Sequence, residues 1–454
     1  MTARYVDVSV QHIQSYLVRA QDLKGRRGAS AMITRATKQD TVIRCLAELP
    51  VAPNDEAGAV DGVISVRLDE PGAELTTEVT GRLVSHLRSS LPAAFIVSTH
   101  RDGASYAEAV AGDIDEQIIT HLPVCAEWPA AKRCDWCNIW PAGEWLDGEE
   151  VCRDCSLRSD AAGRSQQPDW KPLAETRLRR HLADRPGTGP PREVPTDFDQ
   201  LGSLGPITGE HNHLATVLAD GNAIGKLISE LRRAKDTQAL RGAPRTIDDA
   251  TWTALTGAVV TIDSAEATAW RVVPHLVGGD DLLVSVPAHT AWEFVRAYLS
   301  IFGTEVSSLA RKGLVPSASA AVVFHQVKDP FSVVADLAQD LLKTAKKEHY
   351  GGRAAVCWQS ITHDGSARLR GRRSITLDGL DGSWDALARF AQVGKSQRHV
   401  LARALRDGRD IDAQLDRVLS GDDPMSSLVA PFRAAGAPIP LTQAIGMAEW
   451  WWPR

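Results

Sequence analysis

Two short apolar runs flank the sequence Gly278-Gly279-Asp280-Asp281, and this arrangement predicts a tight β-hairpin with carboxylates at its tip. Glycine takes a positive φ at little cost, as reversing turns often require. Adjacent carboxylates on such a turn are costly to hold between buried strands unless a cation neutralises them. The segment therefore indicates metal-dependent phosphoryl or nucleotidyl transfer, although the four residues taken alone fit an exposed turn equally well.

A third carboxylate, Asp220, follows the apolar segment 214–219, which predicts a strand that ends at this residue. A two-metal site needs carboxylates on rigid elements that hold two divalent cations about 3.5–4 Å apart. If the strand pairs with the hairpin, Asp220 and Asp280 can face a common ion. The predicted catalytic and metal-binding residues are therefore Asp220, Asp280 and Asp281, and the predicted ions are two Mg²⁺ or Mn²⁺.

The residues after Asp220 open a predicted helix, and the N–H groups and dipole at a helix N-terminus favour a triphosphate. Lys346, late in the predicted helix 330–347, supplies positive charge for the same phosphates. The predicted nucleotide-binding residues are Gly221, Asn222, Gly225, Gly278, Gly279 and Lys346. Two plainer interpretations stay open: Asn222 as a turn residue, and Lys346 as part of a solvated helix end.

Four of the seven cysteines form two pairs with metal-ligand spacing. Cys134 and Cys137 make the first pair, Cys152 and Cys155 the second, and 14 residues separate the pairs. Four thiolates make a closed tetrahedral zinc site with no open position, so we predict one structural Zn²⁺ without a catalytic role. Such an ion supplies folding free energy on the order of 10 kcal/mol to a module that lacks its own core.

Composition sets broad limits on the function. The chain has 454 residues, enough for roughly three domains. Its net charge of -6, from 51 basic and 57 acidic residues, argues against binding nucleic acid through global charge. The sequence shows neither an apolar run of membrane-spanning length nor a signal peptide, so we expect a cytoplasmic protein without a membrane partner.

The order of strand and helix patterns predicts two α/β regions that share a loose sequence of strand, helix, hairpin and strand. A duplicated fold explains this similarity, and the first copy is the degenerate one, because it has Asp61-Gly62 at its turn but no paired acids. The predicted regions are 1–120, the degenerate α/β domain; 121–165, the zinc-binding module; 166–206, a helix and Pro-rich linker; 207–375, the α/β domain that carries the Gly-Gly-Asp-Asp hairpin; and 376–454, a helical domain.

Some element boundaries are specific enough to be tested. Residues 28–49 and 252–268 are each predicted as a helical stretch, and 411–419 is predicted as one of the C-terminal helices. Segments 62–68 and 93–99 are predicted as strands. The run Trp450-Trp451-Trp452 is either an exposed docking surface or packs back on the helical domain.

Together these residues resemble the large subunit of type III CRISPR effector complexes, the CRISPR polymerase-cyclase family. The second α/β region carries the most specific likeness, the cysteine module sits between two palm-like regions as in that family, and the C-terminal helices match only in type. The matching segments are 219–226 (Ala-Asp-Gly-Asn-Ala-Ile-Gly-Lys), 278–282 with the Gly-Gly-Asp-Asp hairpin, 328–331, 341–347, and in the first region 13–16, 22–23 and 28–30.

The resemblance implies a fold and an activity. The fold is α+β, with two ferredoxin-like palm domains, a zinc ribbon between them and a C-terminal helical domain. The palm pair would bind two ATP molecules and join them into cyclic oligoadenylates, switched on by target RNA in a complex with guide RNA and other CRISPR effector subunits. Asp220, Asp280 and Asp281 would hold the metals, and Lys346 would contact triphosphate.

The sequence departs from the family in places. Many relatives begin with an HD nuclease domain, whereas here the first palm strand starts at residue 5, so we expect no DNase activity from this chain. Asn222 stands where some relatives have a second Asp. Two other functions stay open: a cyclase that makes a cyclic dinucleotide or another nucleotide product without RNA control, and a catalytically silent scaffold subunit.

Overall fold

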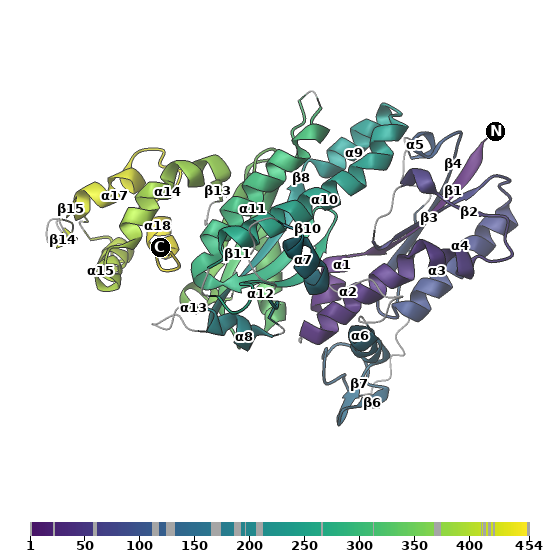
Figure 1. Cartoon of the computed structure of the whole chain (residues 1–454), viewed down its shortest axis with the longest axis horizontal. Coiled ribbons are helices and arrows are strands. Elements are labelled where there is room, and N and C mark those ends of the chain that lie inside the picture. Colours follow the sequence, from purple (N-terminus) through teal and green to yellow (C-terminus); the bar gives the residue numbers. More distant parts are fainter. Residues whose placement is uncertain are drawn as a thin grey trace.

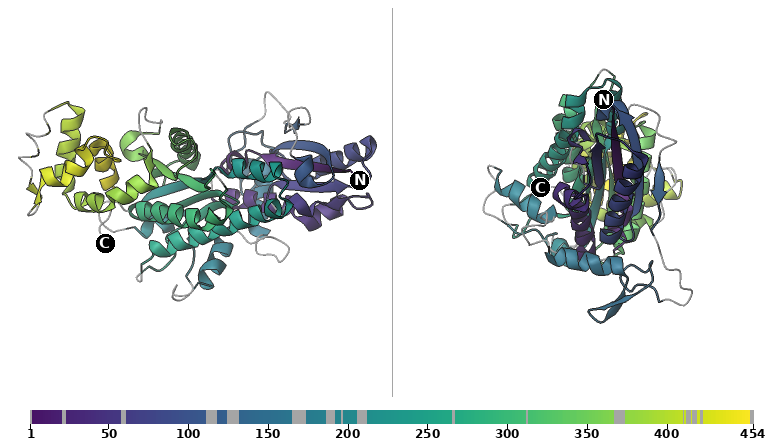
Figure 2. Two further views of the ribbon diagram at one scale, coloured as in Figure 1. Left: turned by 90° about the horizontal axis from the view of Figure 1, so that it is seen from above. Right: turned by 90° about the vertical axis from the view of Figure 1, so that its right-hand side faces the viewer.

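A computed structural model describes the chain apart from residues 1, 21–22, 58–60, 111–117, 124–131, 165–173, 186–191, 196, 206–211, 265–266, 312, 367–373, 410, 412–414, 416–418, 421–422 and 452–454. The molecule is elongated (Figures 1 and 2). An N-terminal sheet lies at one end, a second sheet in the middle and the C-terminal helices at the other end, while the cysteine module projects beside α2.

The N-terminal region is a five-stranded sheet in the order β2-β3-β1-β4-β5. Its strands are β1 (Ala3–Gln11), β2 (Ala52–Pro53), β3 (Val63–Leu68), β4 (Phe95–Gly103) and β5 (Ile119–His121). The helices of this region are α1 (Ile13–Val18), α2 (Leu23–Thr37), α3 (Gln39–Cys45), α4 (Ala73–Ser90) and α5 (Tyr106–Ala109). Strand β1 takes a central position because its alternating valines, Val6, Val8 and Val10, are all buried.

The middle region is a six-stranded sheet in the order β13-β12-β11-β8-β10-β9. Its strands are β8 (His213–Asn222), β9 (Val273–Gly278), β10 (Asp281–Pro287), β11 (Ser317–Gln326), β12 (Ala355–Ser360) and β13 (Ile375–Thr376). The helices are α9 (Ile224–Arg233), α10 (Thr237–Thr261), α11 (Ala291–Val306), α12 (Phe331–Glu348) and α13 (Ile361–Asp364). Strands β8 and β11 are buried along almost their whole length, so their continuous apolar sequences fit the centre of the sheet.

Both sheets share one connectivity. In each, a central strand leads through helix to a hairpin, and a second helix leads to a strand that returns beside the first, with β4 next to β1 and β11 next to β8. These neighbouring strands are antiparallel, and the order strand-helix-strand-strand-helix-strand is ferredoxin-like. The predicted α+β class with two ferredoxin-like palm domains is therefore confirmed.

The two palms pack on each other through a shared core. One hydrophobic cluster contains Val8, Met32 and Leu83 of the first palm together with Leu283 and Leu341 of the second. On the other side of the first sheet, α9 of the second palm buries apolar side chains in a smaller cluster with residues of β1 and α5. Burial on this scale is the main favourable term in folding, so it fixes the palms against one another.

The cysteine module lies between the palms in sequence and packs on the first one. It contains β6 (Glu144–Leu146), β7 (Glu149–Val151) and α6 (Arg153–Arg164), and it is followed by α7 (Ala174–Ala183) and α8 (Phe198–Ser203). Helix α6 crosses α2 closely at Gly28, where a Cβ atom would lie 1.8 Å from the carbonyl oxygen of Arg158. Only glycine fits at that crossing.

The C-terminal region is helical, and its Trp residues pack inward. It contains α14 (Leu377–Ala391), α15 (Lys395–Arg406), β14 (Leu419–Ser420), β15 (Asp423–Pro424), α17 (Met425–Arg433) and α18 (Leu441–Ala448). Trp450 is 2% exposed and stacks on Phe324 of β11, with ring centroids 4.9 Å apart. Trp451 packs on Trp384 of α14. The first two tryptophans are thus core residues rather than a docking surface, and Trp452 lies outside the described residues.

Several boundaries differ from those predicted from the sequence. The predicted helix 28–49 is divided into α2 and α3, separated at Lys38, whose backbone is extended. Helix α4 was not predicted, because most of its residues are polar and its buried stripe is narrow. Helix α10 begins at Thr237 rather than Trp252, since Asp236 caps it and the helix continues through Pro244. The predicted helix 411–419 lies mostly outside the described residues.

Removing the indole of Trp450 should detach the C-terminal helices from the second palm. We expect Trp450→Ala to cost about 3–5 kcal/mol locally, the range for truncating a buried Trp. Limited proteolysis would then show faster cleavage beyond residue 376, and the thermal midpoint would fall. Trp145→Ala is the matched control, because Trp145 is 69% exposed. Equal protease resistance of the two variants would contradict the packing described here.

Candidate carboxylate and cysteine sites

The structure brings the three predicted Asp residues to one edge of the second palm sheet. Strand β8 pairs with β10 antiparallel, and Ala219 lies opposite Leu282, so the next residues along, Asp220 and Asp281, are neighbours across the ladder. Asp280 occupies the turn between β9 and β10, against the backbone of Gly221, which follows Asp220. Strand β8 continues beyond its predicted end to Asn222, so Asp220 lies inside the strand rather than at its end.

The hairpin turn is held from outside by α10. Gly279 has a φ of 58°, a conformation that favours glycine, whereas Gly278 has no positive φ. The backbone N–H of Gly279 donates to Asp248 Oδ1 at 3.1 Å, and Thr251 Oγ1 donates to the Gly279 carbonyl at 2.6 Å. Both side chains of α10 therefore fix the turn that carries Asp280. Their separation from the hairpin in sequence leaves no local signal that could have identified them.

Gly221 is required by its close approach to Asp280. A Cβ atom at this position would lie 2.6 Å from Asp280 Oδ2 and 2.5 Å from the Ile224 side chain. No such crowding exists at the other three predicted glycines: a Cβ atom would have no neighbour within 4 Å at Gly225 or Gly279, and none closer than 4.0 Å at Gly278. The packing demand for glycine is thus specific to Gly221.

Lys346 reaches the site from the last turn of α12. Its Nζ atom lies 2.6 Å from Asp220 Oδ2 and donates to the carbonyl of Gly221 at 2.8 Å. A solvated helix end would leave this ammonium in water, so the plainer interpretation of Lys346 does not describe its position. Three carboxylates face one nearby ammonium, which leaves an excess of negative charge.

This charge imbalance is visible in the pKa values of the hairpin acids. Burial, with repulsion from Asp220, raises the pKa of Asp280 to about 6. Burial and then repulsion from Asp220 and Asp280 raise the pKa of Asp281 to about 7, against smaller opposing effects of Gln14 and Lys346. The site therefore lacks positive charge and presents carboxylate oxygens, the donors that Mg²⁺ takes in nucleotide-processing sites.

A further polar residue, Gln14, reaches the site from the first palm. Its Nε2 atom donates to Asp281 Oδ1 at 2.7 Å. Gln14 lies in α1, so the contact joins the two palms at the carboxylates. The sequence singled out segment 13–16 only as part of the family resemblance and did not assign Gln14 to the site.

The side chain of Asn222 bonds inside the sheet instead of facing the nucleotide site predicted for it. Its side-chain amide donates to Ser317 Oγ at 3.1 Å, Ser319 Oγ at 3.0 Å and the Arg353 carbonyl at 3.0 Å. The residue is 1% exposed. Because β8 extends through this position, Asn222 joins β8 to β11 inside the sheet, and its amide is not available to a nucleotide. It is not a turn residue either.

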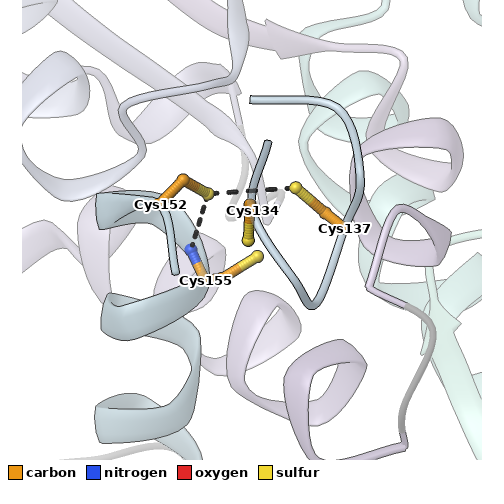
Figure 3. Close-up of side chains that lie close together, drawn as sticks. All are labelled: Cys134, Cys137, Cys152 and Cys155. Carbon is orange, nitrogen blue, oxygen red and sulfur yellow. Dashed lines mark hydrogen bonds between the residues drawn. The ribbon is translucent and has the colours of Figure 1, made fainter. Parts of the chain in front are cut away.

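The four predicted cysteine ligands converge in a second site (Figure 3). Their Sγ atoms all lie within 4.8 Å of one another, and Cys137 and Cys152 are 3.9 Å apart. All four are buried. A tetrahedral zinc with Zn–S bonds of about 2.3 Å requires sulfur atoms close to this spacing, so the cysteines fit one structural Zn²⁺.

The two sites differ in how tightly their donor atoms gather. In the part of the chain that the structure describes, the cysteine cluster is the group of metal-ligand side chains whose donor atoms all converge within 4.8 Å. The three Asp carboxylates do not form such a group, and the Lys346 ammonium lies beside one of them.

Comparison with known proteins finds a known domain in the second palm and a similar overall fold. Residues 213–357 match the model of the second palm domain of Cas10/Cmr2. The whole structure is similar to Csm1 of T. onnurineus, with a TM-score of 0.57 at 13% identity over 99% of this chain and 69% of that one. Residues 213–357 are therefore a domain of the Cas10/Cmr2 second-palm type. The resemblance to the large subunit of type III CRISPR effector complexes is thereby confirmed.

Other solved structures that resemble this chain contain ligands. A Csm1–Csm4 cassette in complex with cA4 aligns with a TM-score of 0.60 at 12% identity, and one in complex with AMPPNP aligns with a TM-score of 0.58 at 13% identity. Each covers 99% of this chain and 69% of the other. Comparison with curated protein sequences gives no significant match. No helix among the described residues is long and apolar enough to span a membrane.

The first palm has no carboxylates at the positions equivalent to Asp220 and Asp281. Strand β1 pairs with β4 as far as Gln11 and Phe95, just as β8 pairs with β11 as far as Asn222 and Ser317, so Ser9 corresponds to Asp220. Ser9 lies opposite Val63 of β3, as Asp220 lies beside Asp281 of β10, so Val63 corresponds to Asp281. Neither residue is acidic, so this palm offers no equivalent carboxylate pair.

Neutralising Asp281 should stabilise the protein when no divalent cation is added. A folded-state pKa of about 7, above the ordinary value, means that stability is lost as pH rises through that range. We expect Asp281→Asn to raise the thermal midpoint at pH 8, with a smaller gain at pH 5. Asp249→Asn, at an exposed position of α10, should leave the thermal midpoint unchanged at both pH values. A lower midpoint for Asp281→Asn at pH 8 would show that the carboxylates do not repel as described.

The cysteine site should bind one zinc ion per chain. Elemental analysis of the purified protein would give a stoichiometry of one, and Cys155→Ser would lower both the zinc content and the thermal midpoint, because the ion stabilises the module. Cys357→Ser provides the control, since Cys357 is a buried cysteine of β12 away from the cluster. Full zinc retention by Cys155→Ser would rule out the four-cysteine assignment.

Proposed function

We propose that this chain synthesises cyclic oligoadenylates from ATP as the RNA-activated large subunit of a type III CRISPR effector complex. The observation that carries the proposal is the carboxylate site: Asp220 and Asp281 are neighbours on paired strands, Asp280 adjoins them, and one ammonium is too little charge to balance all three. Likeness to structures that contain cA4 and AMPPNP supports the choice of substrate and product.

The Asp residues would hold two Mg²⁺ or Mn²⁺ ions. The fit rests on the chemistry of the donor atoms, which are carboxylate oxygens, the donors that Mg²⁺ takes. The raised pKa values of Asp280 and Asp281 indicate that the site is short of positive charge. When bound, such ions stabilise the attacking and leaving oxygens of an in-line displacement. In the reaction, a ribose hydroxyl of one nucleotide attacks the α-phosphorus of another, a new O–P bond forms, and pyrophosphate leaves.

The chain's own residues would bind and orient the substrate. Gly221 lets Asp280 lie directly against the backbone of β8, because a Cβ atom there would be 2.6 Å from Asp280 Oδ2. The backbone N–H groups at the N-terminus of α9, which follows, would bind phosphate oxygens. Lys346, paired with Asp220 in this structure, would exchange that carboxylate for triphosphate once metal ions neutralise the acids. Gln14 would orient Asp281 from the first palm.

Partners follow from the relatives. One similar structure is a Csm1–Csm4 subcomplex in the type III-A CRISPR-Csm interference complex, with a TM-score of 0.57 and 13% identity. We extend this to the present chain as a proposal: it assembles with other effector subunits, and guide RNA paired with target RNA controls its activity. Base pairing, rather than this acidic chain, would then supply sequence recognition.

Mass spectrometry of the products formed from ATP would test the function. The reconstituted complex, with Mg²⁺ or Mn²⁺ and target RNA, should yield cyclic oligoadenylates. The double variant Asp280→Ala, Asp281→Ala should yield only background, because two of three metal ligands are gone. The matched control, Asp249→Ala, removes an exposed acid on α10 and should leave the yield unchanged.

Other outcomes separate the alternative functions. Cyclic dinucleotides, or products from another base made by the isolated chain without RNA, would replace the proposal with an RNA-independent cyclase. Failure of every nucleotide to bind in the presence of Mg²⁺ or Mn²⁺ would favour a scaffold subunit. An unchanged yield from the double Asp variant would show that chemistry occurs elsewhere.

A further inference from the structure

We propose that the zinc module positions the catalytic carboxylates, through a buried Asp154–Arg158–Tyr16 cluster that fixes helix α1 and thereby places Gln14 on Asp281. This inference rests on the function proposed for the carboxylate site. Tyr16, Asp154 and Arg158 are positioning residues in it, since none of them touches the carboxylate site.

Helix α1 needs outside support to hold Gln14. It spans only Ile13–Val18, and helices this short are unstable on their own in water. Its N-cap residue, His12, is in the left-handed conformation and makes no side-chain capping bond. The position of Gln14 must therefore come from what packs on and bonds to α1.

Arg158 of α6 supplies that support at the other end of α1. Its guanidinium donates to the carbonyl of Tyr16 at 2.7 Å and to that of Leu17 at 3.3 Å, which are end groups that lack partners inside the helix. The same guanidinium lies over the Tyr16 ring, 4.2 Å from its centroid. Arg158 is fully buried, so these bonds are shielded from water.

Asp154 connects this contact to the cysteine site. It accepts from Arg158 Nε at 2.6 Å and from Tyr16 Oη at 2.8 Å, and it also pairs with Arg19. Asp154 lies between Cys152 and Cys155, so the fold that zinc imposes on these two ligands also places its carboxylate. It is 3% exposed, and its charge is balanced by two arginines.

Together the contacts form a continuous path from the cysteine ligands through Asp154, Arg158 and α1 to Gln14 and Asp281. Partners that hydrogen-bond a metal-ligating carboxylate fix its orientation, and losing one typically costs about 10–100-fold in metal affinity or activity. Spatial continuity alone does not show coupling, so the test must compare single and double variants.

The test measures Mn²⁺ binding to the full chain by electron paramagnetic resonance, without nucleotide. Binding at the palm is the part that Asp280→Ala, Asp281→Ala abolishes. Gln14→Ala should weaken that binding about 10–100-fold. Arg158→Lys, which keeps the charge but cannot make the forked contact, should weaken it in the same direction while retaining one zinc per chain. Arg153→Lys, an exposed position on the same helix, should leave it unchanged.

Non-additivity decides whether Arg158 acts through Gln14. If it does, Arg158→Lys combined with Gln14→Ala binds Mn²⁺ no more weakly than Gln14→Ala alone, and kcat for ATP in the complex falls in parallel. Normal Mn²⁺ affinity in zinc-loaded Arg158→Lys, or additive losses in the double variant, would overturn the inference and leave the proposed function intact. If palm binding of Mn²⁺ is absent in the wild-type chain, the proposed function fails first.

A milder variant covers the case in which Arg158→Lys does not fold. Tyr16→Phe removes only the hydroxyl that donates to Asp154 and keeps the ring under the guanidinium. It should weaken palm Mn²⁺ binding less than Gln14→Ala does. Combined with Gln14→Ala, it should weaken that binding no further than Gln14→Ala alone. Unchanged binding in folded, zinc-loaded Tyr16→Phe would then count against the positioning role.

Discussion

Three partly buried carboxylates repel one another in the second palm, and the elements around them must hold them together against that repulsion. Asp220, Asp280 and Asp281 meet where two strands and a turn converge, and Lys346 neutralises only part of their charge. A fold held by its cores can tolerate such a cost locally. Three features keep the acids together although separation would lower their repulsion. The hairpin is short, two side chains of α10 bond to its turn, and Gly221 lets Asp280 lie close to the backbone. That concentration of negative charge is what makes the site attractive to cations.

The packing of the two palms supplies the stability that offsets the repulsion among these acids. Residues of the first palm enter the core beneath the second sheet, and α9 covers part of the first. The carboxylate site therefore depends on both halves of the chain, and Gln14 of the first palm bonds directly to Asp281 of the second. The cysteine module braces the same region, since its helix α6 packs against α2 at Gly28 and bonds to the end of α1.

Local signals made much of this site predictable. A Gly-Gly turn between apolar runs, an Asp after a strand and two close pairs of cysteines are each readable over a few residues, and the structure brings together the acids and thiols they pointed to. Gln14, Asp248 and Thr251 carry no such signal, because their partners lie far away in sequence. Asn222 was misassigned because the end of β8 came later than its apolar run suggested. Helix α4 was missed because a narrow buried stripe among polar residues is a weak pattern.

The duplicated fold has an asymmetry with a directional consequence. The matching registers place Ser9 and Val63 where the second palm has Asp220 and Asp281, so only one half of the pair bears acids at these positions. If two nucleotides bind between such halves, they are not interchangeable: the one over the second palm always presents its phosphate to the acids, and the one over the first is held differently. Joining of nucleotides on this scaffold would consequently have a fixed polarity, because the two palms differ in charge at these two positions.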